Sequence, residues 1–154
     1  MNVSLYLRVR FSECDAQNVV FNARYADYVD VVSTEYMRYL IGGYQMLVER
    51  GFFTQVVNLN IDWFAPAVFD DVLLLTMSCA NIGTSSFSLT CSIERLSDHI
   101  KIAQASVVYV VLDDTKAAKT PIPKDIRTRL VNDMHVGPLN FAGDIAAMST
   151  KIPV

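Results

Sequence analysis

The strongest constraint on the fold is a helical pattern over residues 23 to about 40, a stretch that contains no glycine or proline. Apolar and aromatic residues recur there at the spacing of one helix face, whereas most charged residues lie elsewhere. The predicted core-facing residues are Tyr25, Tyr28, Val29, Val32, Tyr36, Tyr39 and Leu40. Asn22 is a suitable N-cap and Gly42-Gly43 a suitable stop. Packing against a sheet accounts for this aromatic face better than a ligand-binding role does.

Strand patterns flank the helix on both sides. Residues 3–11 alternate apolar and polar side chains, which is typical of a half-buried strand. Four more strands are predicted at residues 56–64, 71–82, 86–96 and 102–112. Short helices are predicted at residues 45–50 and 124–131. This order predicts an α+β fold in which an antiparallel sheet of about five strands, the last four in meander-like succession, wraps one long helix.

Composition narrows the class of protein. Hydrophobic residues make up 52% of the 154-residue chain and charged residues only 19%, below the roughly 25% charged that is usual. We therefore expect a second subunit to cover part of the apolar surface. The net charge is −3 and no basic run exceeds two residues, which argues against nucleic-acid binding. Arg8 and Arg10 argue against a signal peptide, and no apolar run approaches the roughly 20 residues of a membrane span.

The cysteines indicate the cellular compartment, and the length indicates the number of domains. Cys14, Cys79 and Cys91 are odd in number and lack the spacing of a metal site. Free thiols in a reducing cytosol fit this pattern, so we expect a cytoplasmic protein. The length suits one domain over residues 1–154. Residues 135–154 show no strong periodicity and are expected to form a tail that is either mobile or docked on a partner subunit.

An acid occupies the polar segment between the first strand and the long helix. Asp15 is therefore expected near a helix N-terminus, where free backbone N–H groups and the helix dipole can polarise a carbonyl group. A carboxylate that activates water beside such a donor makes a plausible hydrolase site. Two alternatives stay open. Asp15 could simply close an Asx-turn, or Cys14 could be the nucleophile, although His99 and His135 are both far away in sequence.

The segment from Asp15 to Tyr25, DAQNVVFNARY, resembles the signature of the 4-hydroxybenzoyl-CoA thioesterase family within the hotdog-fold acyl-CoA thioesterases. That signature reads D-x-x-G-x-V-x-x-x-x-Y with a catalytic aspartate, and Asp15, Val20 and Tyr25 match it in place. Asn18 stands where the family usually has glycine. Further family-like features follow in order, at residues 57–64, 69–73, 85–87 and 121–123, so that the resemblance covers roughly residues 3 to 130.

The resemblance implies a hotdog fold, in which a long central helix packs on a curved sheet and two subunits join their sheets edge to edge. It also implies hydrolysis of an acyl-CoA thioester to a free acid and coenzyme A, with an acyl carrier protein left open as the donor. Asp15 would attack the thioester carbon as a nucleophile or act as general base on water. The backbone N–H of Asn22 would polarise the carbonyl group. No cofactor is implied beyond the coenzyme A of the substrate, and no metal.

Residues expected to bind the substrate fall into two groups. The first, near the helix start and at the end of the strand 56–64, comprises Val20, Phe21, Tyr25, Trp63 and Phe64. The second, where some relatives carry basic residues that grip the coenzyme A phosphates, comprises Thr84, Ser85 and Ser86. Basic residues elsewhere are alternative phosphate contacts, such as Lys124, Arg127 and Arg129. The expected assembly is a homodimer or homotetramer.

Other interpretations stay open. Asn18, the missing basic residues and the apolar composition are also compatible with a non-catalytic protein that binds acyl-CoA or an acyl carrier protein. An acyl hydratase is disfavoured because no histidine lies near Asp15 in the sequence. Glu13, two residues before Asp15, is either a solvated acid or a like charge that acts on Asp15.

Overall fold

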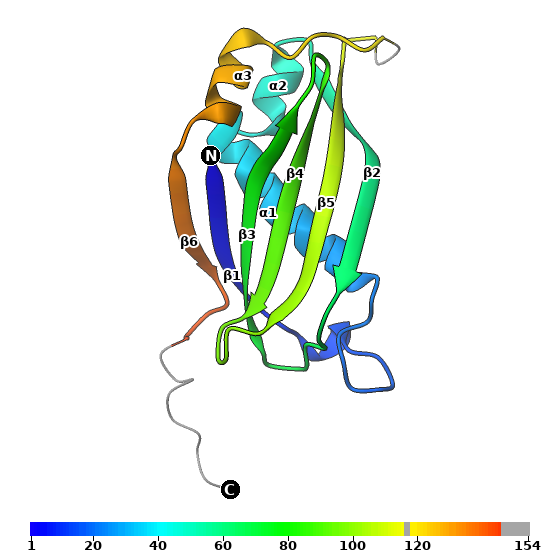
Figure 1. Cartoon of the computed structure of the whole chain (residues 1–154), viewed down its shortest axis with the longest axis vertical. Helices are drawn as coiled ribbons and strands as arrows, with labels where there is room; N and C mark the ends of the chain where they lie inside the picture. The colour runs from blue at the N-terminus through cyan, green and yellow to red at the C-terminus, as the bar shows by residue number, and fades with distance from the viewer. Residues whose placement is uncertain (116–117, 146–154) are drawn as a thin grey trace, which may run out of the picture.

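The computed structural model describes residues 1–115 and 118–145 (Figure 1). In chain order its elements are β1 (Asn2–Arg8), a 3₁₀ turn (Phe11–Glu13), α1 (Arg24–Ile41), α2 (Tyr44–Glu49), β2 (Phe53–Trp63), β3 (Val72–Ile82), β4 (Ser86–Arg95), β5 (Lys101–Leu112), α3 (Lys124–Val131) and β6 (His135–Phe141). The predicted long helix, both short helices and all five predicted strands are present. The α+β class is therefore confirmed.

The six strands form one sheet in the order β2-β5-β4-β3-β1-β6. Neighbouring strands are antiparallel, except that β6 runs parallel to β1. The predicted meander is correct for β3, β4 and β5 but wrong for β2, which pairs with β5 at the far edge. Alternating side chains predict which residues are extended, whereas the loop after a strand decides which strand lies beside it.

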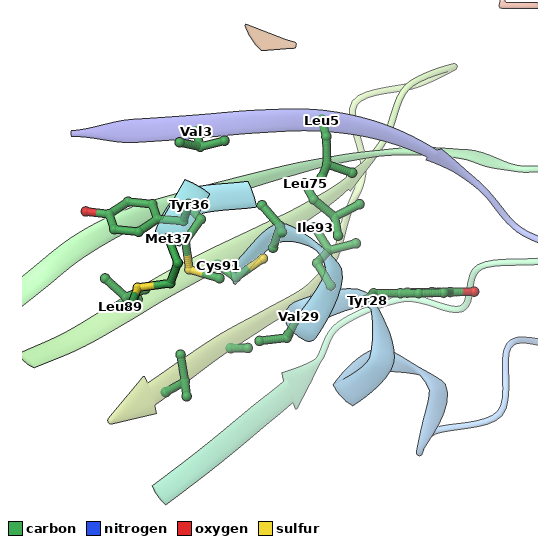
Figure 2. Close-up of a cluster of buried hydrophobic side chains, with 14 of the residues drawn as sticks. Val3, Leu5, Tyr28, Val29, Tyr36, Met37, Leu75, Leu89, Cys91 and Ile93 are labelled. Atoms are coloured by element: carbon green, nitrogen blue, oxygen red, sulfur yellow. The ribbon is translucent and has the colours of Figure 1, made fainter. Parts of the chain in front are cut away.

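The helix α1 crosses one face of the sheet and supplies the centre of the core (Figures 1 and 2). The predicted core face is confirmed at every position but one, with these residues buried: Tyr25, Tyr28, Val29, Val32, Tyr36 and Leu40. Tyr39 is 40% exposed, because at that end of α1 it borders a surface hollow. Burying each large apolar side chain here contributes about 1.5–3 kcal/mol.

The two ends of α1 differ in how well they were predicted. Gly42 ends the helix in the left-handed conformation, with φ 86°, so the predicted stop is confirmed. The predicted N-cap at Asn22 is wrong. The helix begins after Ala23, and no side chain caps its first turn. Ala23 already has right-handed helical backbone angles, so the chain enters α1 through a turn and not through an extended capping residue.

The strand β6 arises from a segment for which no regular structure is predicted. Residues 135–141 pair in parallel with β1, so about five strands is one too few, and this part of the expected tail lies within the sheet. Most residues of β6 are exposed, which removes the alternation that reveals a half-buried strand. Residues 146–154, the remainder of the expected tail, lie outside the described residues.

The opposite edge of the sheet is open. Among the described residues, no strand pairs with the outer side of β2. A register shift between Val56 and Asn58 marks a bulge in this strand. Large apolar side chains stay exposed on β2 and just after it, namely Val56, Val57, Leu59, Trp63 and Phe64. A long apolar edge of this kind favours pairing with another chain.

Candidate active site

The chain between β1 and α1 folds into a tight turn that carries Asp15. The backbone N–H of Asp15 donates to the carbonyl oxygen of Val19 at 2.9 Å, and the N–H of Asn18 donates to the carbonyl oxygen of Asp15 at 3.0 Å. Asn18 has φ 61°, in the left-handed region that glycine adopts freely and that asparagine tolerates better than most residues. Asn18 therefore keeps the backbone shape that a glycine would give at this position.

The Asp15 carboxylate is half-buried and only partly engaged. Its Oδ1 accepts a hydrogen bond from the backbone N–H of Gln17 at 2.8 Å, which is the Asx-turn considered above. No group among the described residues donates to its Oδ2. The turn therefore fixes the carboxylate through one oxygen and leaves the other available to a substrate or a water molecule.

Free backbone donors lie at the start of α1. The N–H of Phe21 donates to the carbonyl oxygen of Glu13, and the N–H of Arg24 donates to that of Phe21. Between them, the N–H groups of Asn22 and Ala23 have no partner among the described residues. Because α1 begins at Arg24, these two groups stand at its positive dipole end, as the oxyanion donor in the prediction requires.

A surface hollow of about 320 Å³ lies beside this helix start. Its walls are formed by Val19, Val20, Asn22, Tyr25, Trp63, Phe64, Ala65 and Pro66. The rings of Tyr25 and Trp63 meet edge to face, with centroids 6.2 Å apart. The hollow brings together most of the first predicted group, but not Phe21, whose side chain is 48% exposed. Ala65 and Pro66 were missed because nothing in the sequence marks them as a wall.

The second predicted group lies at the other end of the sheet. Thr84 and Ser85 belong to the β3–β4 turn, whereas the Asp15 turn follows β1 at the opposite end (Figure 1). The carbonyl oxygen of Thr84 accepts from the N–H of Ile122 at 2.9 Å, and the guanidinium of Arg127 donates to the carbonyl oxygen of Gly83. Within one protomer, the two groups of predicted substrate-binding residues therefore do not form one site.

The basic residues near this turn are partly engaged. Arg129 donates to the carbonyl oxygen of Leu40 at 3.0 Å, and Arg127 binds the β3–β4 turn. Lys124 is exposed and Arg127 is partly buried, whereas Arg129 is exposed but held by its hydrogen bond to the C-terminal end of α1. Arg127 thus lies next to the turn that carries Thr84 and Ser85, two of the residues predicted to contact coenzyme A.

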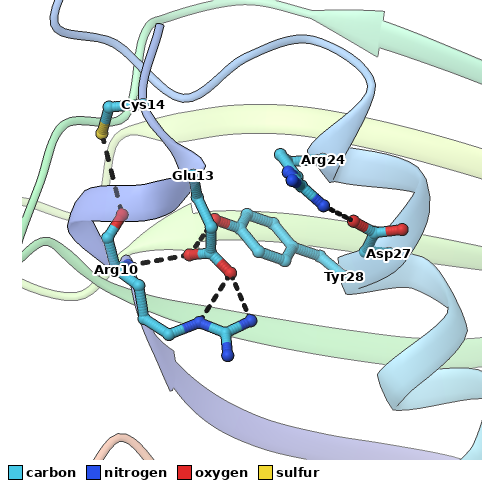
Figure 3. Close-up of polar contacts among 6 residues, drawn as sticks. All are labelled: Arg10, Glu13, Cys14, Arg24, Asp27 and Tyr28. Carbon is cyan, nitrogen blue, oxygen red and sulfur yellow. Dashed lines mark hydrogen bonds and ion pairs between the residues drawn. The ribbon is translucent and has the colours of Figure 1, made fainter.

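Glu13 is not the solvated acid of the first alternative considered for it. It is only 4% exposed, and its carboxylate is surrounded by donors (Figure 3). Oε2 accepts from the backbone N–H of Arg10 at 2.7 Å and from the hydroxyl of Tyr28 at 2.9 Å. Oε1 accepts from Nε and Nη2 of Arg10 at 2.9 and 2.7 Å. Apart from an arginine three residues before the acid, nothing in the sequence indicates this network.

The network sets the charge of Glu13. Burial acts to raise the pKa of this carboxyl, but the hydrogen bonds from Arg10 and Tyr28 outweigh burial, and the pKa lies below its ordinary value. Burial, together with the neighbouring Glu13, raises the pKa of the Tyr28 hydroxyl. At neutral pH, Glu13 is therefore a carboxylate and Tyr28 a neutral donor.

The alternative nucleophile, Cys14, lacks a base. Its Sγ lies 3.9 Å from the carbonyl oxygen of Arg10 (Figure 3), and that is its one hydrogen-bond partner among the described residues. A cysteine nucleophile needs a nearby base or cation to form a thiolate. The geometry thus favours Asp15 over Cys14.

Comparison with known proteins identifies the family. The model of the thioesterase superfamily matches residues 17–102, more than half of the chain. The chain belongs to the thioesterase superfamily. This confirms the predicted family and class of enzyme. The matched range begins two residues after Asp15, so the match by itself says nothing of that residue.

Relatives within and near the thioesterase superfamily agree with this assignment. The acyl-CoA thioester hydrolase YbgC of Escherichia coli is 26% identical over 129 residues, which span 82% of this chain and 96% of that protein. A 1,4-dihydroxy-2-naphthoyl-CoA thioesterase from Synechocystis aligns with TM-score 0.77 at 20% identity, covering 84% of this chain and 96% of its own. A variant of 4-hydroxybenzoyl-CoA thioesterase bound to 4-hydroxybenzoyl-CoA aligns with TM-score 0.76 at 21% identity, covering 84% and 98%. These structures confirm the hotdog fold.

No helix in residues 1–115 and 118–145 is long and apolar enough to cross a membrane. No cluster of three or more histidine, cysteine, aspartate or glutamate side chains suited to a metal ion occurs in those same ranges.

Proposed function

We propose that this protein is an acyl-CoA thioester hydrolase in which Asp15 is the reacting acid. One arrangement carries the proposal. A carboxylate with a free oxygen and a helix start with two unpartnered N–H groups are attached to the same turn, beside an aromatic-walled hollow. The names of the relatives, which include acyl-CoA thioester hydrolases and aryl-CoA thioesterases, support the same substrate class.

Each part has a chemical role in this proposal. The acyl group occupies the hollow against Tyr25, Trp63 and Phe64, and the thioester carbonyl faces the N–H of Asn22. This N–H stabilises the oxyanion that forms when the carbonyl carbon is attacked. Asp15 either attacks that carbon directly, giving a mixed anhydride that water then hydrolyses, or removes a proton from the attacking water. Coenzyme A leaves as the thiol in both routes.

We further propose that the working unit is a dimer joined along β2. Two antiparallel copies of β2 side by side, related by a two-fold axis, continue the sheet and bury the exposed apolar residues of that edge. Because the axis reverses the strand direction, the β3–β4 turn of one protomer comes to the same end of the joined sheet as the Asp15 turn of its partner. The Thr84 hydroxyl and the Arg127 guanidinium would then bind the coenzyme A part of the substrate in the partner's site.

Release of free thiol from a panel of thioesters tests the proposed function. The panel contains short, long and branched aliphatic acyl-CoAs, 4-hydroxybenzoyl-CoA and an acyl carrier protein thioester. We expect turnover of at least one member by the wild type and a fall in kcat of about 10²- to 10⁴-fold in Asp15→Asn. The folding of this variant should be unchanged, because the amide oxygen can still accept from Gln17.

The matched control is Asp98→Asn. Like Asp15, Asp98 accepts from the backbone N–H of the residue two positions later, and it accepts from an arginine as well. It lies in the β4–β5 turn and does not line the hollow. The kcat of Asp98→Asn should therefore equal that of the wild type. Saturable binding of acyl-CoA without thiol release across the panel would instead identify a non-catalytic acyl-binding protein. Unchanged kcat in Asp15→Asn would contradict the role of Asp15.

A further inference from the structure

The buried carboxylate of Glu13 connects three separate parts of the chain. Arg10 lies just after β1, and both its backbone N–H and its guanidinium donate to this carboxylate. Tyr28 lies on the second turn of α1 and donates its hydroxyl. Glu13 itself ends the 3₁₀ turn. One side chain thus ties the exit of β1 to the body of α1 (Figure 3).

The backbone of Glu13 makes a fourth connection. Its carbonyl oxygen accepts from the N–H of Phe21 at 2.9 Å, on the arm of the turn that leads into α1. Asp15 lies two residues after Glu13, and Asn22 lies one residue after Phe21. Glu13 therefore anchors the chain two residues before the acid and, through Phe21, one residue before the proposed oxyanion donor.

Burying the Glu13 carboxylate costs free energy, and this cost makes the geometry of its hydrogen bonds specific. A buried carboxylate must keep all its hydrogen bonds, since losing any of them leaves a desolvated charge, so the network permits only one geometry. Anchoring the turn to the core alone could be done by an apolar side chain at this position. An apolar side chain would not fix the direction of the turn relative to the start of α1, because hydrophobic contact is not directional.

We propose that Glu13 is a positioning residue that, through Tyr28, fixes the Asp15 turn relative to the first amides of α1. This inference rests on the proposed function. Displacing reacting groups by about 1 Å costs on the order of 10²-fold in rate, whereas it changes substrate affinity far less. Loss of the network therefore acts on kcat and leaves KM nearly unchanged.

Steady-state kinetics of two variants test the inference. Glu13→Gln keeps the size of the side chain but removes its charge, and Tyr28→Phe removes only the hydroxyl that reaches Glu13. We expect kcat to fall about 10- to 100-fold in each, with KM within about twofold of the wild type. The double variant should be no slower than Glu13→Gln alone, because both changes break the same connection. Near-UV circular dichroism and thermal unfolding report the folded fraction in each sample.

Wild type, Asp15→Asn and Asp98→Asn are measured beside them. Absence of turnover in the wild type would overturn both the proposed function and this inference. Turnover that is lost in Asp15→Asn but unchanged in Tyr28→Phe would overturn the inference alone. A kcat that falls only in proportion to the unfolded fraction, or a change confined to KM, would show a structural role and also overturn it. If Glu13→Gln does not fold, Tyr28→Phe decides the question, because its ring still packs against Tyr25.

Discussion

The two edges of the sheet are built in opposite ways. One edge strand is β6, which is short and carries Pro138, a residue with no N–H to donate, while the other edge strand, β2, is long and apolar. A long apolar edge invites another strand, whereas a short edge that carries proline is a poor partner. The comparison favours extension of the sheet along β2. In the dimer that we propose, this extension brings the β3–β4 turn of one protomer towards the Asp15 turn of the other.

Breaking the open edge should have the largest effect. Leu59 lies near the middle of β2, so a two-fold axis at the centre of a joined pair brings the two Leu59 side chains close together. Leu59→Lys places two like charges there, and we expect a monomer whose kcat/KM is lower by about 10²-fold. Analytical ultracentrifugation and thiol release measure the two effects. Val131→Lys, a charge at a more exposed apolar position on α3, should change neither.

Mixing two impaired variants sharpens the same comparison. Thr84 is exposed on the β3–β4 turn, and Thr84→Glu should repel the phosphates of coenzyme A and raise KM by about tenfold. Refolded together with Asp15→Asn, it should restore about a quarter of the wild-type activity at low substrate, since half of the dimers are mixed and each carries one intact site. Activity that stays at the average of the two variants would show that each protomer forms its own complete site.

The pairing of β6 with β1 should matter for stability but not for catalysis. Gly137 has φ 97°, and a Cβ there would strike the carbonyl oxygen of Ser4 on β1. Gly137→Ala should therefore lower the free energy of unfolding by about 2–4 kcal/mol, as measured by urea denaturation. Its kcat and KM should match those of the wild type at a temperature where it is folded. A loss of dimer in this variant would contradict the assignment of the two edges.

Lowering the pH should have the smallest effect on stability, and it should act on the Asp15 turn and not on either edge of the sheet. The pKa of Glu13 is lowered in the folded protein from an ordinary value of 4.5, so its stabilising contribution is complete above that pH. The contribution is lost as the pH falls through the lowered native value. We expect wild type to exceed Glu13→Gln by about 1–3 kcal/mol in unfolding free energy at pH 7. This difference should shrink steadily in denaturation series below pH 4.5.

Much of this molecule could be predicted from local pattern. The face of α1, the turn positions, the strands β3 to β5 and the short helix α3 follow from side-chain periodicity and from glycine and proline, which act over a few residues. Asp15, Val20 and Tyr25 were found because a family signature fixes their spacing. Asn18 departs from that signature, but its left-handed backbone keeps the turn that a glycine would give.

The rest depended on contacts between residues far apart in the sequence. Only the tertiary structure paired β2 with β5 and placed β6 beside β1, because an edge strand is held by backbone hydrogen bonds that leave little pattern in its side chains. Only the tertiary structure turned Glu13 inwards, since an acid is buried only when donors such as Tyr28 reach it from another element. The sequence by itself determined most of the elements and pointed to the acid that we propose to react, while packing decided the order of the strands and what holds that acid in place.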